Sequence, residues 1–168
     1  MNQMIRMAAA AAVVGLGMTA AQPAQSQEPV TSETLMIYAA FAKLEANIQE
    51  TALVIGLTGL LTDDMAAERE EMALEFENDL AQVERYLDIL RGADISDDQR
   101  AVLARFEEKW GPIAAKGREL LQEQADTPEY RQRALNFWRM IDAVDDLIDD
   151  KLEDMRARYG ADWPDRES

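Results

Sequence analysis

The segment Ser96 to Gln124, SDDQRAVLARFEEKWGPIAAKGRELLQEQ, decides the fold class. Its apolar residues recur at alternating spacings of three and four, which places them on one face of an α-helix, as in coiled-coil packing. Ser96 and Gln99 have the spacing of a capping box, so the helix is expected to begin here. Pro112 cannot donate a backbone hydrogen bond and predicts a kink in the middle. The apolar face consists of Leu103, Phe106, Trp110, Ile113, Gly117 and Leu120.

Three further amphipathic stretches flank this segment, and each has an apolar face of the same periodicity. Helices are expected over Ser32–Leu61 and Thr62–Arg91, with Gly92 as the stop signal of the second. Thr127 is the expected N-cap of a last helix over Pro128–Tyr159. Long helices with short links and no strand signal predict an all-α, up-down-up-down four-helix bundle. Its predicted core includes Phe76, Leu80, Leu87, Phe106, Trp110, Ile113, Phe137, Ile141 and Ile148.

The N-terminal residues have the pattern of an export signal. Arg6 precedes an apolar run over Met7–Met18, and two small-x-small cleavage motifs follow. A run of about 12 residues is shorter than the roughly 20 that span a bilayer, so no stable membrane anchor is expected after cleavage. The expected location is periplasmic or secreted. The expected divisions are a signal peptide over residues 1–26, a polar lead-in over 27–31, the bundle over 32–159 and a flexible tail over 160–168.

The composition argues against several functions. The chain has no cysteine and no histidine, and its 33 acidic against 17 basic residues give a formal net charge of −16. Such a charge repels nucleic acid, which is therefore not an expected partner. The sequence also lacks a serine nucleophile elbow, a phosphate-binding loop and a dinucleotide fingerprint. We therefore expect no catalytic residues, no cofactor and no enzymatic activity.

Two groups of charged residues are candidate binding sites. Four acids share one face of the last predicted helix and are weak candidates for holding calcium or magnesium, but a straight helix cannot surround an ion, so a solvated face is the favoured interpretation and no metal site is expected. Cations on the last two helices are candidates for contacting an anionic ligand or a partner, although pairing with the many acids is the alternative. The acids are Asp142, Asp146, Asp149 and Glu153, and the cations are Arg105, Lys116, Arg131 and Arg139.

The run Thr51–Leu61, TALVIGLTGLL, has no charged residue and must be covered by something. One interpretation is a buried helix end in which Gly56 and Gly59 let another helix approach closely. The other is a homodimer or partner interface with Leu57 and Leu60 as contact residues, or the wall of an apolar pocket. We favour a homodimer or protein partner for this run. A chaperone would instead leave the same apolar surface accessible to unfolded clients.

Residues from about Leu44 to Leu152 resemble the helical sensor module at the N-terminus of type IV pilus chemotaxis transducers and nitrate/nitrite sensor kinases. The resemblance rests on FENDLAQVERYLDIL, on VLARFEEKWGPIAAKGRELL with its Trp-x-Pro centre, and on LNFWRMIDAVDDLI. It implies a four-helix bundle that dimerises and binds a small ligand or a protein partner outside the inner membrane. The first helix of that family carries a Gly-Arg-Gln-Arg-Met type signature. The corresponding LEANIQETALVIG has no arginine, so no oxyanion-binding residue is carried over.

A second resemblance gives the alternative function. Residues 95–100, ISDDQR, are similar to the Leu-Thr-x-x-Gln motif of periplasmic stress chaperones and metal-resistance proteins. This resemblance implies a stress chaperone or a metal-stress accessory protein. A capping box by itself also explains Ser96 and Gln99. The histidine metal ligands of that group have no counterpart in this chain.

Overall fold

The computed structural model describes residues 29–62, 64–123 and 127–159. These residues form four α-helices and contain no strand, which confirms the predicted all-α class. The expected signal peptide and tail lie outside the described residues. The helices are α1 (Ser32–Thr58), α2 (Ala66–Gly92), α3 (Asp97–Leu121) and α4 (Pro128–Tyr159).

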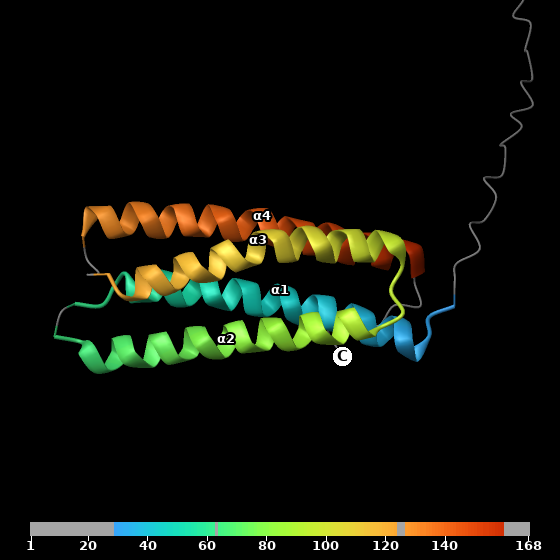
Figure 1. The fold of residues 1–168 in the computed structure, drawn as a ribbon, viewed down its shortest axis with the longest axis horizontal. Helices are drawn as coiled ribbons and strands as arrows, with labels where there is room; N and C mark the ends of the chain where they lie inside the picture. The colour runs from blue at the N-terminus through green and yellow to red at the C-terminus, as the bar shows by residue number, and fades with distance from the viewer. Residues whose placement is uncertain (1–28, 63, 124–126, 160–168) are drawn as a thin grey trace, which may run out of the picture.

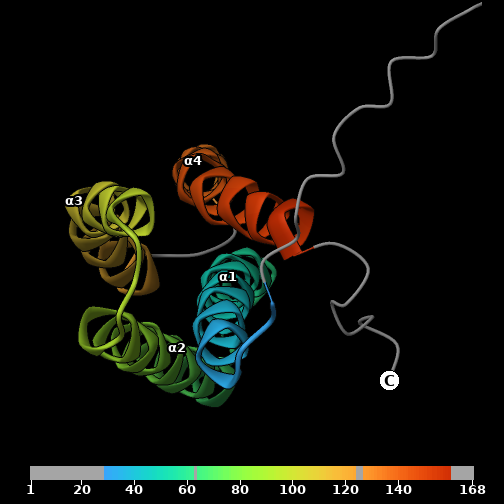
Figure 2. The ribbon, with the colours of Figure 1, turned by 90° about the vertical axis from the view of Figure 1, so that its right-hand side faces the viewer.

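The four helices lie side by side, and consecutive helices run in opposite directions (Figure 1). The end view in Figure 2 shows α1 between α2 and α4, with α3 completing the group. The backbone of helix α1 comes close to each of the other three helices, whereas the backbones of α2 and α4 do not come close to each other in the described part of the chain. Helix α1 is therefore the central element of the fold. No helix among the described residues is both long enough and apolar enough to cross a membrane.

Side-chain caps fix three of the helix starts. Thr31 Oγ1 accepts a hydrogen bond from the Thr34 amide at 3.0 Å, at the start of α1. The predicted capping box is confirmed, because the Gln99 amide donates to Ser96 Oγ and the Ser96 amide donates to Gln99 Oε1. At the start of α4, the Tyr130 amide donates to Thr127 Oγ1 at 3.0 Å. These bonds satisfy amides that have no partner inside the first helical turn.

The prediction that α2 begins at Thr62 is wrong. The helix begins at Ala66, after Met65, and no side chain caps it. The reason is local, since the Thr62 hydroxyl bonds to the Asp64 carboxylate at 2.5 Å and does not accept a hydrogen bond from a helix amide. At its other end, α2 includes Gly92 as its last residue, so the predicted stop is correct to within one position.

Helix α1 is shorter than predicted and ends at Thr58, not at Leu61. Tight backbone turns follow it, with the Leu60 amide bonded to the Leu57 carbonyl at 2.9 Å and the Leu61 amide bonded to the Thr58 carbonyl at 3.1 Å. Bonds over three residues tighten the backbone and take the chain out of the α-helix. Helix α3 also ends earlier than expected, at Leu121, after continuing through Pro112. It bends in its middle, as Figure 1 shows.

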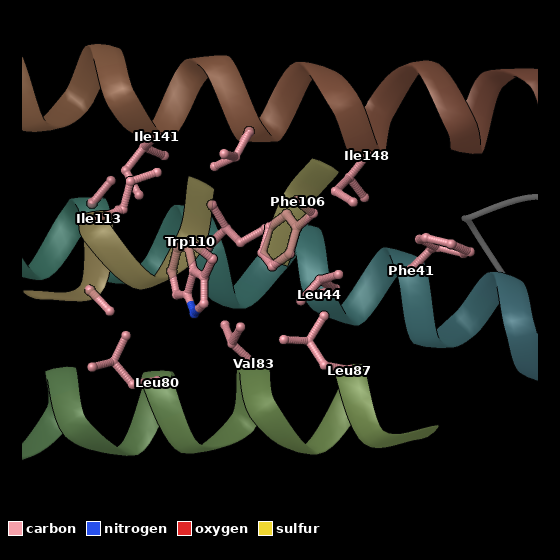
Figure 3. Packing of buried hydrophobic residues seen from close by; sticks show 14 of the residues in the cluster. Phe41, Leu44, Leu80, Val83, Leu87, Phe106, Trp110, Ile113, Ile141 and Ile148 are labelled. Atoms are coloured by element: carbon pink, nitrogen blue, oxygen red, sulfur yellow. The ribbon is translucent and has the colours of Figure 1, made fainter. Parts of the chain in front are cut away.

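A single apolar core lies between the helices. All nine predicted core residues are buried. Figure 3 shows core side chains from all four helices pointing toward one another, and the rings of Phe106 and Trp110 stack with their centroids 5.5 Å apart. Trp138 on α4 differs from the buried Trp110, because 40% of it is exposed.

Gly117 sets how closely α3 approaches the core. A Cβ atom added there would lie 2.8 Å from Phe76 Cε2, still closer to Phe76 Cζ, and 3.2 Å from Phe137 Cε2. The Phe76 and Phe137 rings lie side by side with centroids 6.5 Å apart. Buried aromatic rings cannot shift freely in a densely packed interior, so this position has no room for a side chain.

Gly117→Ala should therefore lower the free energy of unfolding by about 1–3 kcal/mol through overpacking. Gly92→Ala, at the last residue of α2, is the control, because nothing lies within 4 Å of an added Cβ there apart from the chain neighbours, and no proline follows it. The control should be neutral or should stabilise by up to about 1 kcal/mol, as alanine favours helix more than glycine does. Urea unfolding followed by circular dichroism measures both. Equal effects at the two glycines would contradict this account of the core.

Candidate functional site

The outer side of α1 carries three exposed leucines. Leu53 is 52% exposed, Leu57 is 41% exposed and Leu60, just beyond the helix end, is 76% exposed. Leu53 and Leu57 are four residues apart, which places them on one side of the helix, and Leu60 follows in the turn after it. We call these three residues the leucine stripe. Large apolar side chains that gather on the surface of a protein commonly mark an interaction site.

The inner side of the same run is buried and explains why it has no charge. Ala52, Val54 and Ile55 belong to the core. Thr51 and Thr58 are also buried, and their hydroxyls donate to carbonyls of the same helix, to Ile48 at 2.6 Å and Val54 at 2.8 Å. Buried hydroxyls with these bonds cost little. The uncharged run is therefore divided between the core on one side and the leucine stripe on the other.

The two glycines of the run face α4 of the same chain. A Cβ added at Gly56 would lie 3.5 Å from Trp138 Nε1, and one at Gly59 would lie 2.8 Å from Tyr130 Cε1. The Tyr130 hydroxyl donates to the Ile55 carbonyl at 3.0 Å, which ties α4 to the end of α1. The glycines therefore allow close packing inside one chain, as the first interpretation of the run expected.

Helix α4 extends the apolar surface. Trp138 lies beside Gly56 and is 40% exposed, and Leu135, one turn before it, is 49% exposed. Residues three apart on a helix are neighbours on its surface. We call this combined surface the α1–α4 apolar face, and it consists of Leu53, Leu57, Leu60, Leu135 and Trp138.

A buried carboxylate lies at the seam between α1 and α2. Asp79 is only 9% exposed, and its Oδ2 atom is buried without a hydrogen-bond partner. Burial, which has the largest effect, and the charges of Glu50 on α1 and Glu75 on α2 together raise the pKa of Asp79 to about 6. A buried carboxylate without a partner is unfavourable in its charged form.

A second carboxylate lies on the other side of α1. The Gln49 amide donates to both carboxylate oxygens of Asp145 on α4, at 3.2 and 3.3 Å. Burial raises the pKa of Asp145, and the nearby charges of Asp149, Asp146 and Asp142 act in the same direction, against the effect of Gln49. Helix α1 is thus bordered by acidic groups on both the α2 side and the α4 side.

A polar cavity of about 220 Å³ lies at the end of the bundle where α1 begins. Lys151, 5% exposed, lines it and donates to Asp98 and, at 2.7 Å, to Asp154. Burial opposes the charge of Lys151, but the hydrogen bonds to Asp154 and Asp98 outweigh it and raise its pKa. The hydrogen bond from Lys151 lowers the pKa of Asp98. The lysine is thus neutralised by its own chain, so this end of the bundle has a structural ion pair.

Two of the four cations predicted to contact a ligand have a partner on their own helix. Lys116 Nζ pairs with Glu119 at 2.7 Å on its own helix, and Arg139 donates to Asn136 at 3.2 Å. Arg105 on α3 is exposed. Arg131 is also exposed, near the start of α4. A contact of any of these four residues with a ligand or a partner stays a prediction.

The acids proposed as weak metal candidates are all exposed. Among the described residues, no group of three or more acids is arranged so that it could hold a metal ion. Their positions on a single helix agree with the solvated face that the sequence favoured. The residues concerned are Asp142, Asp146, Asp149 and Glu153.

Of the predicted contact residues, Leu57 and Leu60 lie on the surface, where a partner could contact them. Asp79 was not predicted from the sequence, although it interrupts the apolar face of α2 between Phe76 and Leu80. An acid at a core-facing position is the sequence signal that indicates such a buried carboxylate.

Comparison of the chain with models of known families, with curated proteins and with solved structures finds no match.

The raised pKa of Asp79 makes stability depend on pH. The folded state holds this proton more tightly than the unfolded chain, so Asp79 contributes stability below about pH 4, and this contribution is lost as the pH rises through about 6. Asp79→Asn should therefore be more stable than the wild type above pH 6, by about 1–2 kcal/mol after allowance for solvent screening.

Unfolding in urea at several pH values between about 4 and 8 measures this difference. Carboxylates whose pKa is lowered, such as Glu77 beside Arg118, act oppositely but equally in both proteins, and they cancel in the comparison. The advantage of the variant should shrink as the pH falls. A difference that is the same at every pH would show that the carboxylate of Asp79 is already well solvated or paired.

Proposed function

We propose that this chain is a non-catalytic, exported binding module, similar to extracytoplasmic sensor domains, which docks a protein partner on its α1–α4 apolar face. The observation that carries the proposal is the leucine stripe, which stays exposed although α1 packs against all three other helices. Each Å² of apolar surface removed from water contributes roughly 25 cal/mol, so this face favours a partner that covers it.

The proposed absence of catalysis is supported by the chemistry of the side chains. The chain has no histidine or cysteine. Asp79 has a markedly raised pKa, but it does not line the polar cavity at Lys151. An acid that titrates near pH 6 is useful in catalysis when it faces a substrate-sized cavity together with a second group. In its seam between two helices, Asp79 is better suited to a role in stability or recognition.

Two occupants of the face other than a distinct partner remain as outcomes of a test. A second copy of the chain would make the module a homodimer, as the resemblance to sensor modules implies. Unfolded clients would make it a chaperone, the alternative from the Leu-Thr-x-x-Gln resemblance. The chaperone resemblance rests on residues 95–100. Within them, Ser96 and Gln99 form both hydrogen bonds of a capping box, so capping the helix is sufficient to explain these two residues.

A photo-reactive phenylalanine analogue placed at position 57 in the full chain should form one discrete cross-linked product in the exporting cell. The same analogue at position 74 is the control, because Leu74 is 64% exposed but lies on α2, outside the α1–α4 apolar face. The mass of the product shows whether the occupant is a second copy or another protein. A ladder of many products would indicate a chaperone. No product, or the same product from both positions, would refute the proposed docking face.

Leu57→Asp combined with Leu60→Asp should abolish that contact, measured with the cross-linker at position 53. Both leucines are already exposed, so the fold should be kept, with a change in the free energy of unfolding within about 0.5 kcal/mol. Circular dichroism checks this point. An undiminished cross-link in the double variant would show that the leucine stripe does not hold the partner.

A further inference from the structure

Three carboxylates gather along the α2 edge of the leucine stripe. Asp79 is close enough to Glu50 and Glu75 for both charges to raise its pKa. Glu50 precedes Leu53 by three residues on α1, so the two side chains are neighbours on the helix surface. Because α1 and α2 run in opposite directions (Figure 1), Glu75, one turn before Asp79, is displaced along α1 toward Leu57. We call Asp79, Glu50 and Glu75 the acidic trio.

The acidic trio has no counter-charge of its own. The influences on Asp79 are burial and two like charges, and no cation of the described chain is among them. Asp79 Oδ2 is buried and unpartnered. Within the described residues, no hydrogen bond or ion pair engages the side chain of Glu50 or Glu75, although many other acids of this protein are paired. Like charges that share a partly buried site repel one another, so a cation placed there would be strongly favoured.

The geometry indicates which kind of cation fits. The described residues contain no group of three acids arranged to hold a metal ion. A cation carried on a long, flexible side chain does not need such a cage, since it reaches several carboxylates from outside. Arginine is well suited, because its planar guanidinium presents five donors and forms paired hydrogen bonds with carboxylates. Lysine offers a compact charge with three donors.

We propose that the partner docked on the α1–α4 apolar face is a basic amphipathic helix, whose apolar side chains cover Leu53 and Leu57 while an arginine or lysine is held by the acidic trio. This inference rests on the proposed function and specifies the chemistry of the partner. A second copy of this chain fits less well, because each copy carries a net charge of −16 and would bring further acids to the site. A basic partner is attracted at long range as well as held on contact.

Binding of a cation by the acidic trio makes the affinity for the partner depend on pH. A cation beside the trio favours the charged form of Asp79 and lowers its pKa from about 6, so docking releases a proton below neutral pH. The basic helix should therefore bind more tightly at about pH 7 than at about pH 5. Added salt should weaken the interaction, because exposed charges contribute part of it.

The test uses the full chain and three synthetic helical peptides with the same leucine seam. Their flanking positions carry arginine, glutamine or glutamate. Fluorescence anisotropy should give dissociation constants in the order arginine, then glutamine, then glutamate, with arginine tighter than glutamine by about tenfold at low salt. In Glu50→Gln combined with Glu75→Gln, the preference for arginine over glutamine should fall to about threefold or less, while the affinity for the glutamine peptide is unchanged.

The matched control is Glu70→Gln combined with Asp150→Asn, which removes the same net charge from exposed positions outside the trio. It should keep the full preference for arginine. An equal loss in both double variants, or equal binding of the arginine and glutamine peptides by the wild type, would overturn the basic-helix inference and leave the docking face intact. Failure of all three peptides to bind would overturn the inference, and an absent cross-link at position 57 would then remove the proposed function itself.

Discussion

The packing of α1 against all three other helices is the constraint on which the rest of the structure depends. A helix surrounded on three sides has little surface on which to carry charge, and its C-terminal half accordingly has none between Thr51 and Leu61. Close contact with α4 requires small residues, which Gly56 and Gly59 supply opposite two aromatic rings. The one remaining side of α1 then presents the leucines to solvent. Burial and the proposed recognition thus use the same uncharged run, on opposite sides of one helix.

Much of the architecture was predictable because the apolar residues alone determine it. The spacing of Leu103, Phe106 and Trp110 required a helix, and the capping box at Ser96 fixed where it begins. The start of α2 was not predictable, since Thr62 has the side chain of an N-cap but bonds to Asp64. The local sequence identifies which side chains are able to cap a helix. A hydroxyl can have two hydrogen-bond partners nearby. The conformation of the turn that positions the hydroxyl determines which of them it binds.

The candidate site was predictable only in part. The sequence showed that the run ending at Leu61 must be covered, but periodicity alone does not tell which side of α1 faces its neighbours when three helices surround it. Trp138 illustrates the difficulty, because a tryptophan in the middle of a helix is usually buried, yet here it lies at the edge of the contact with Gly56. The acidic trio joins residues of two helices, and its members come together only through the register of α1 against α2. That register is a property of the packed core.

Trp110 and Trp138 have different surroundings, so their fluorescence can report on two different events in the protein. Trp110 is buried against Phe106, so its emission follows the integrity of the core. Trp138 is partly in water at the edge of the α1–α4 apolar face, and its indole moves to a drier environment when that face is covered. A blue shift that disappears in Trp138→Phe therefore signals occupancy of the face without any attached dye. Loss of the Trp110 signal, in contrast, signals unfolding, so the two events are separable in one sample.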